Sequence, residues 1–99
     1  MMIVVEGTAR IPEGVLETVR PAMEKMILAS RAEVGCIDYA YSIDMLDPTL
    51  VRVTERWVDR EALQAHFKTP HVAEWRAAWS DIKISDVSLR LFDAEPEDM

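Results

Sequence analysis

The sequence has very few cysteines: Cys36 is the only one among 99 residues. A single thiol excludes a disulfide framework within the chain and a metal site built from several thiolates. We interpret Cys36 as a small buried hydrophobic residue. Long apolar runs are also missing, because no segment approaches the roughly 20 residues of a membrane span. The start of the chain lacks the basic and apolar regions of a signal peptide, so we expect a cytoplasmic protein without a membrane partner.

Basic residues are scarce as well: 11 Lys and Arg stand against 18 Asp and Glu, which gives a formal net charge of −7. Binding of nucleic acid depends on clustered Lys and Arg, so this balance argues against a nucleic acid partner. Several acidic residues gather at the C-terminal end, and without them the chain is only mildly acidic. A chain of this length suffices for one domain. We therefore divide it into a single domain, residues 1–93, and an acidic tail, residues 94–99.

Apolar periodicity predicts the order of the elements. Alternation with period two predicts strands at residues 2–9, 36–45, 50–58 and 84–93. Helical spacing predicts a helix from residue 15 to about residue 33 with a kink at Pro21, and a second helix from residue 60 that is broken at Thr69-Pro70. Asp59 is the expected N-cap of the second helix.

The order β-α-β-β-α-β in one short chain most simply forms an α+β ferredoxin-like fold, a four-stranded antiparallel sheet with helices on one face. That arrangement leaves the other face of the sheet uncovered. The candidate residues for this face include apolar ones, and a second subunit is the simplest cover for them. The pattern therefore predicts a homodimer that associates through the sheet face.

The segment from residue 54 to residue 71 runs from a strand straight into a helix and holds the candidate site. Glu55 and Trp57 share one face of the strand, and His66 lies on the apolar face of the helix. If these two faces pack together, a carboxylate, an indole and an imidazole meet in one small apolar space. We regard this space as the first place to look for function.

The two histidines, His66 and His71, are five residues apart. On one continuous helix this spacing places them on different faces, and the break at Thr69-Pro70 leaves their relative position open. We therefore predict no metal site.

Three stretches of the sequence resemble the antibiotic biosynthesis monooxygenase (ABM) domain. They are Glu33-Val34-Gly35-Cys36-Ile37-Asp38-Tyr39, then Glu55-Arg56-Trp57-Val58-Asp59-Arg60-Glu61-Ala62-Leu63, and His66 with Thr69-Pro70-His71. The resemblance covers nearly the whole chain, from the first strand to about Phe92. It implies a dimeric α+β barrel, in which two ferredoxin-like sheets pack face to face. The family includes oxygenases that convert quinols or anthrones to quinones with molecular oxygen and no metal or flavin, haem-degrading relatives, and members of unknown activity.

The resemblance implies a cofactor-independent monooxygenase whose partners are a small quinol- or anthrone-like aromatic substrate and molecular oxygen. Such a reaction needs a base, a hydrogen-bond donor for the substrate anion and a dry pocket. His66 is the expected base, because its pKa lies near working pH, and Glu55, if it reaches His66, would orient the ring and stabilise the imidazolium. Arg52 or Arg56 is a further anion partner if its face lines the pocket. The expected substrate-binding residues are Tyr39, Tyr41, Trp57, Trp75 and His71.

Two other interpretations remain open. Packing alone explains a histidine on an apolar face or tryptophans at core spacing, so the chain could be a non-catalytic dimeric module that binds a small molecule or only holds a dimer. A haem-degrading oxygenase needs an axial histidine and an open apolar slot. The resemblance to those enzymes includes an Asn near the haem, and the sequence has no Asn, so the haem-degrading interpretation ranks lower. An apolar pocket beside His66 would favour the oxygenase, and a filled core there would favour the module.

Overall fold

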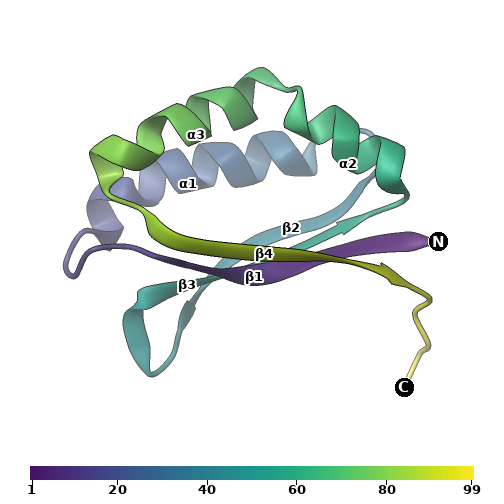
Figure 1. Ribbon diagram of the computed structural model, residues 1–99, viewed down its shortest axis with the longest axis horizontal. Helices are drawn as coiled ribbons and strands as arrows, with labels where there is room; N and C mark the ends of the chain where they lie inside the picture. The colour runs from purple at the N-terminus through teal and green to yellow at the C-terminus, as the bar shows by residue number, and fades with distance from the viewer.

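Four strands and three helices follow one another in the predicted order (Figure 1). The computed structural model describes all residues, 1–99. The second predicted helix is divided into two, at the predicted position. The strands are β1 (Met2–Arg10), β2 (Cys36–Asp44), β3 (Asp47–Trp57) and β4 (Ser85–Ala94), and the helices are α1 (Leu16–Arg31), α2 (Arg60–Phe67) and α3 (Pro70–Ile82).

The strands form one antiparallel sheet in the order β2-β3-β1-β4. All three helices lie over the same face of this sheet, and α1 runs beside α3 (Figure 1). This is the predicted ferredoxin-like arrangement. None of the helices is both long and apolar enough to cross a membrane.

Side-chain caps fix the path of the chain from β3 through α2 to α3. The Asp59 carboxylate accepts a hydrogen bond from the Ala62 N–H at 2.8 Å, as the sequence predicts for an N-cap. The Thr69 hydroxyl accepts from the Val72 N–H at 3.4 Å and donates to the His66 carbonyl at 2.7 Å. One side chain therefore ties the end of α2 to the start of α3. Caps of this kind each contribute about 1 kcal/mol.

Most boundaries lie within two residues of the sequence prediction, and the start of β3 differs by more. β3 begins at Asp47 and not at Leu50, because Asp47 already pairs with Asp44 of β2 next to the hairpin turn. Pro48 is tolerated there because the pairing between β3 and β1 ends at Leu50. The first helix, α1, begins at Leu16 and continues through Pro21 as one element, as predicted.

The two faces of the sheet differ in character. Along β3 the helix-facing side chains are buried, whereas Arg52 and Arg56 alternate with them and point to the open face. Neither arginine is therefore an anion partner inside the site. The open face is mixed, with apolar and charged residues side by side. By the strand register it carries Val4, Glu6, Ala40, Arg52, Thr54, Arg56, Arg90 and Phe92.

The core lies between the sheet and the helices. Trp57 is completely buried at the centre of this core. Cys36 is partly buried and packs against the core, and burial raises the pKa of its thiol. The buried cluster consists of Ile3, Val5, Ile11, Val19, Met23, Met26, Tyr39, Val51, Trp57, Leu63, Val72 and Trp75.

Candidate functional site

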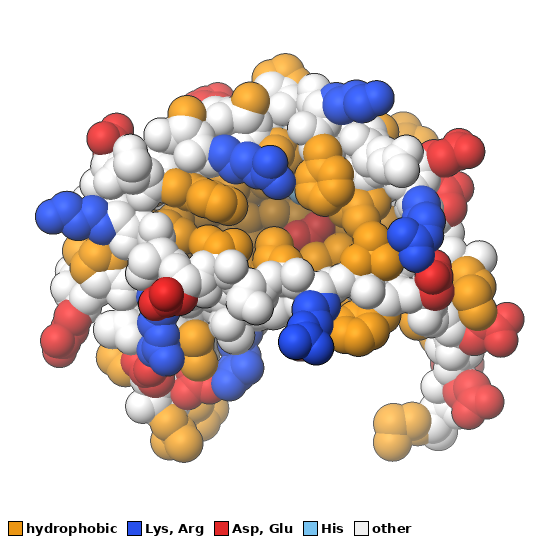
Figure 2. Space-filling view, in the orientation of Figure 1, with side chains coloured by type: hydrophobic (Ala, Val, Ile, Leu, Met, Phe, Trp, Pro, Cys, Tyr) orange, Lys and Arg blue, Asp and Glu red, His pale blue; other side chains and the backbone are white.

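A cavity remains between the sheet and the helices. Figure 2 shows it as a hollow between α3 and β4, bordered by hydrophobic side chains and with an acidic side chain at its base. Its volume is about 650 Å³ including the open mouth, and 15 of its 18 lining residues are hydrophobic. The other three are Glu55, His66 and Arg76. A mostly apolar cavity with a few converging polar groups is typical of a small-molecule site.

Glu55 projects from the middle of β3 and is only 5% exposed. Burial raises the pKa of Glu55 to about 7, and the nearby Glu33 carboxylate adds to the rise. The Trp57 Nε1–H donates to Glu55 Oε1 at 3.0 Å, which favours the ionised form but does not offset burial. Near neutral pH this carboxyl group therefore exists in both protonation states, and it can give or take a proton inside the cavity.

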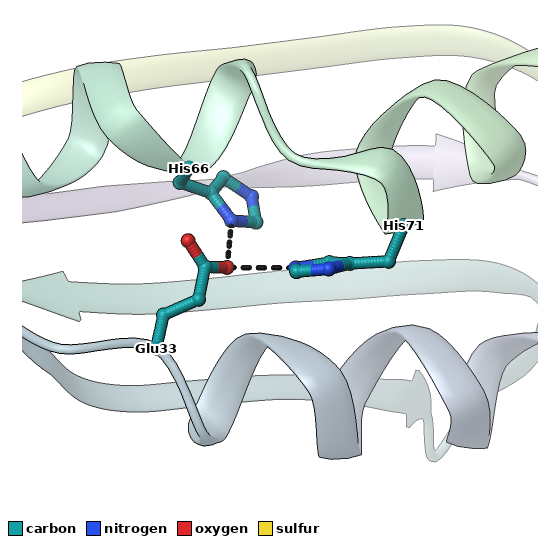
Figure 3. Close-up of side chains that lie close together, drawn as sticks. All are labelled: Glu33, His66 and His71. Atoms are coloured by element: carbon teal, nitrogen blue, oxygen red, sulfur yellow. Dashed lines mark hydrogen bonds and ion pairs between the residues drawn. The ribbon is translucent and has the colours of Figure 1, made fainter.

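His66 lines the cavity from α2 and is 3% exposed. Its Nδ1 lies 2.6 Å from Glu33 Oε2 (Figure 3). A carboxylate oxygen only accepts, so the proton of the neutral ring is on Nδ1 and the lone pair is on Nε2, which has no hydrogen-bond partner in the protein. Burial lowers the pKa of His66, although Glu33 opposes the shift. The ring is therefore a neutral base, and the partner that orients it is Glu33, not Glu55 as the sequence analysis expected.

His71 lies outside the cavity, in the first turn of α3. Its Nε2 donates to the same Glu33 oxygen at 2.8 Å (Figure 3). The spacing of five residues would separate two side chains on one continuous helix, but the break at Thr69 starts a new helix and returns His71 toward His66. The centres of the two rings are 5.9 Å apart.

The two predicted tyrosines lie side by side on the helix-facing side of β2 and both line the cavity. The hydroxyl oxygens of Tyr39 and Tyr41 are 2.7 Å apart and share a hydrogen bond. Burial raises the pKa of both phenols, so both stay protonated at neutral pH. One hydroxyl donates to the other, which leaves one O–H free to donate to a ligand.

The predicted tryptophans take different positions. Trp75 lines the cavity and stacks on Tyr41, with ring centres 6.0 Å apart and planes at 26°. Trp57 does not line the cavity; it lies behind His66, with its ring centre 4.7 Å from that of the imidazole. Trp75 therefore belongs to the cavity wall, while Trp57 supports His66 and Glu55 from the core.

Glu33, His66 and His71 also have the composition of a metal site. Their ligand atoms lie within 4.8 Å of one another, and imidazole nitrogens with a carboxylate oxygen suit several divalent transition metals. In the structure one nitrogen of each ring donates a hydrogen bond to the same Glu33 oxygen.

Sequence reasoning missed two residues of the site. Glu33 belongs to a stretch that resembles the ABM domain, but it is 33 residues from His66, and no local pattern reveals their contact. Arg76 was detectable, because it follows Val72 by four residues and so shares the apolar face of α3. Its guanidinium lies 5.6 Å from the centre of the Phe67 ring, and both side chains line the cavity.

Residues 2–78 match the sequence profile of the antibiotic biosynthesis monooxygenase family. The chain belongs to this family. The first strand, the stretch that contains Glu33, and all of the polar cavity residues fall inside the matched region.

Individual relatives of this ABM protein are distant. An uncharacterised Synechocystis protein is 28% identical over 90 residues, which cover 91% of this chain and 61% of that protein, so the chain spans about three-fifths of the relative's length. A crystal structure of an antibiotic biosynthesis monooxygenase superposes with a TM-score of 0.82 at 27% identity, covering 97% of this chain and 100% of the other. A Deinococcus radiodurans protein provisionally given the same family name has a TM-score of 0.88 at 23% identity, covering 100% and 97%. The last comparison shows the shared fold alone.

Proposed function

We propose that this ABM protein is a monooxygenase that oxidises a quinol- or anthrone-like aromatic with molecular oxygen and without a cofactor. The observation that carries the proposal is the apolar cavity in which His66, Glu55, Tyr39 and Tyr41 converge. A filled core around His66 would have favoured a non-catalytic module. Membership in the family supports a monooxygenase in general, and the cavity residues support this reaction type.

The reaction begins with removal of a phenolic proton by His66 Nε2. The electron-rich anion passes an electron to oxygen far more readily than the neutral phenol does. The free tyrosine hydroxyl donates to the anion, and the apolar walls exclude water, which strengthens that hydrogen bond. Glu33 holds the imidazole in the reactive tautomer and stabilises the imidazolium that forms, as a carboxylate does for a catalytic histidine in general.

The second half of the reaction forms a carbon–oxygen bond and breaks the oxygen–oxygen bond of the resulting peroxide. One oxygen atom stays in the quinone product, and the other leaves as water with two hydrogens of the substrate. We assign Glu55 as the proton donor to the departing oxygen, because its pKa of about 7 leaves it partly protonated at neutral pH. Trp75 and Tyr41 stack on each other and form an aromatic part of the cavity wall, against which an aromatic substrate would pack.

The experiment that tests this function is oxygen uptake by metal-free protein with a menadiol-like substrate. His66→Ala is expected to lower the rate about 10²-fold or more, because it removes the general base. His71→Ala removes the other imidazole on Glu33 but leaves the cavity wall intact, so its loss is expected to be much smaller. Wild-type rates in a folded His66→Ala protein would refute the assignment. Equal rates with and without wild-type protein would leave a binding module as the explanation of the cavity.

We also propose that two chains associate through the open face of the sheet. Apolar residues such as Val4, Ala40 and Phe92 are spread over this face and have no helix above them. The dimeric α+β barrel that the family resemblance implies places the same faces together. The cavity lies on the helix side of each sheet, so each protomer would keep its own site.

A further inference from the structure

The three side chains Glu33, His66 and His71 converge from three separate segments of the chain (Figure 3). Glu33 follows the end of α1, His66 lies in α2, and His71 lies in the first turn of α3. Their side chains are 13%, 4% and 18% exposed, and one carboxylate oxygen contacts a nitrogen of each ring. Two imidazole nitrogens and a carboxylate oxygen are therefore held together in a largely enclosed space.

The geometry points to a binding site for a divalent transition-metal ion, of which Zn²⁺ is the representative. Ligand atoms around a tetrahedral zinc ion lie about 3.3 Å apart, since each bond is about 2.0–2.1 Å long. The nitrogen–oxygen distances of 2.6 and 2.8 Å would widen by about 0.7 and 0.5 Å to admit the ion. Glu33 lies outside any helix or strand, so its side chain can make this small movement. Water would complete the coordination.

The ion has a route to this site that avoids the cavity. Neither Glu33 nor His71 lines the cavity, so the site lies behind His66 when viewed from the substrate side. His71 also borders a shallow depression between α1 and α3, together with Lys25 and Glu74. An ion can therefore approach His71 from the outer surface.

Binding of the ion and catalysis by His66 exclude each other. A neutral imidazole has one N–H and one lone pair. In the hydrogen-bonded arrangement the lone pair is on Nε2, available to the substrate. An ion on Nδ1 takes a lone pair there, so the remaining proton must move to Nε2, and the cavity loses its base. We infer that the ion inhibits the enzyme from outside its active site; this inhibition rests on the proposed function, whereas the metal site itself does not.

Metal binding is tested with the full-length protein stripped of metal, by calorimetric titration with Zn²⁺ and by the visible absorption of Co²⁺. We expect one ion per chain. His71→Gln and Glu33→Gln should each weaken the affinity roughly a hundredfold, the effect of losing one ligand. Glu74→Gln is the matched control, because this carboxylate borders the same depression but its partner is Lys25, and it should bind as the wild type does. Absence of binding up to about 1 mM Zn²⁺, or binding unchanged in both ligand variants, would overturn the site.

Inhibition is tested in the oxygen-uptake assay. Zn²⁺ should suppress wild-type uptake, a chelator should restore it, and His71→Gln should resist the same concentration of Zn²⁺. Full activity of the zinc-loaded wild type would overturn the inhibition while the metal site stands. If metal-free wild type shows no uptake at all, the proposed function fails, and the titration still decides whether the site exists.

Discussion

Glu55→Gln is expected to make the protein more stable, by an amount that grows with pH. Glu55 is 5% exposed, and burial raises its pKa to about 7 from an ordinary value of 4.5. A raised pKa in the folded state means that folding favours the protonated carboxyl group. The stability that this group contributes is complete below pH 4.5 and is lost as pH rises through 7. The difference of 2.5 pKa units between these values corresponds to about 3 kcal/mol at about 1.36 kcal/mol per unit.

Glutamine removes the charge and little else. Its side-chain carbonyl can accept the same hydrogen bond from the Trp57 Nε1–H, so packing and hydrogen bonding are kept. The variant should therefore match the wild type below pH 4.5, gain stability over it as pH rises from 4.5 to 7, and stay about 3 kcal/mol more stable above pH 7. Stability that increases on removal of a carboxylate is what a site retained for chemistry would show.

The measurement is urea denaturation followed by tryptophan fluorescence, at one protein concentration and at several pH values. The other titrating groups are common to both proteins, so the difference between the two free energies of unfolding isolates Glu55. Glu24→Gln on the exposed side of α1 is the control, and its difference should stay within about 0.5 kcal/mol throughout. A Glu55→Gln difference that is constant with pH, or that favours the wild type at high pH, would refute the assignment of a raised pKa.

Two further expectations concern the sheet. A Cβ on Gly7 would lie 1.9 Å from the Ser88 carbonyl oxygen and 2.8 Å from the Leu89 Cα, so Gly7→Ala must force β1 and β4 apart. The free energy of unfolding, measured by urea denaturation, should fall by about 3 kcal/mol. A fall below about 0.5 kcal/mol would contradict this close approach. Light scattering at micromolar concentration should give twice the chain mass of 11.3 kDa. Val4→Asp on the open face should produce monomers while Leu28→Asp on the outer side of α1 does not, and a folded monomeric wild type would contradict association through the sheet.

The order of the elements could be predicted from the sequence because it depends on local signals. Alternation marks strands, helical spacing marks helices, and Asp59 and Thr69 cap helices that begin within three residues of them. The boundary of β3 was less accessible, because Asp47 joins the strand through pairing with Asp44 and not through its own preference. Local patterns predict which elements form, and pairing decides where they end.

The site could be predicted only where its contacts are local. Alternation places Glu55 and Trp57 on one face of a strand, and the structure adds the hydrogen bond between them. The contact of His66 with Glu33 depends on how the end of α1 is positioned against α2, which no spacing in the sequence reports. The position of His71 depends on the direction in which the chain leaves α2 at Thr69. For these reasons the sequence paired His66 with Glu55, whereas the structure pairs it with Glu33.

His66 lines the cavity, while its Nδ1 contacts Glu33, which lies outside the cavity lining. Under the proposed function, reactivity and substrate fit are therefore governed by different residues. Substitutions at His71 alter the strength of the base without touching any atom that a substrate meets, and substitutions at Trp75 reshape the cavity without altering the hydrogen bonds to Glu33. An enzyme arranged in the proposed way would change its substrate and the rate of its chemistry independently, through mutations at His71 and at Trp75.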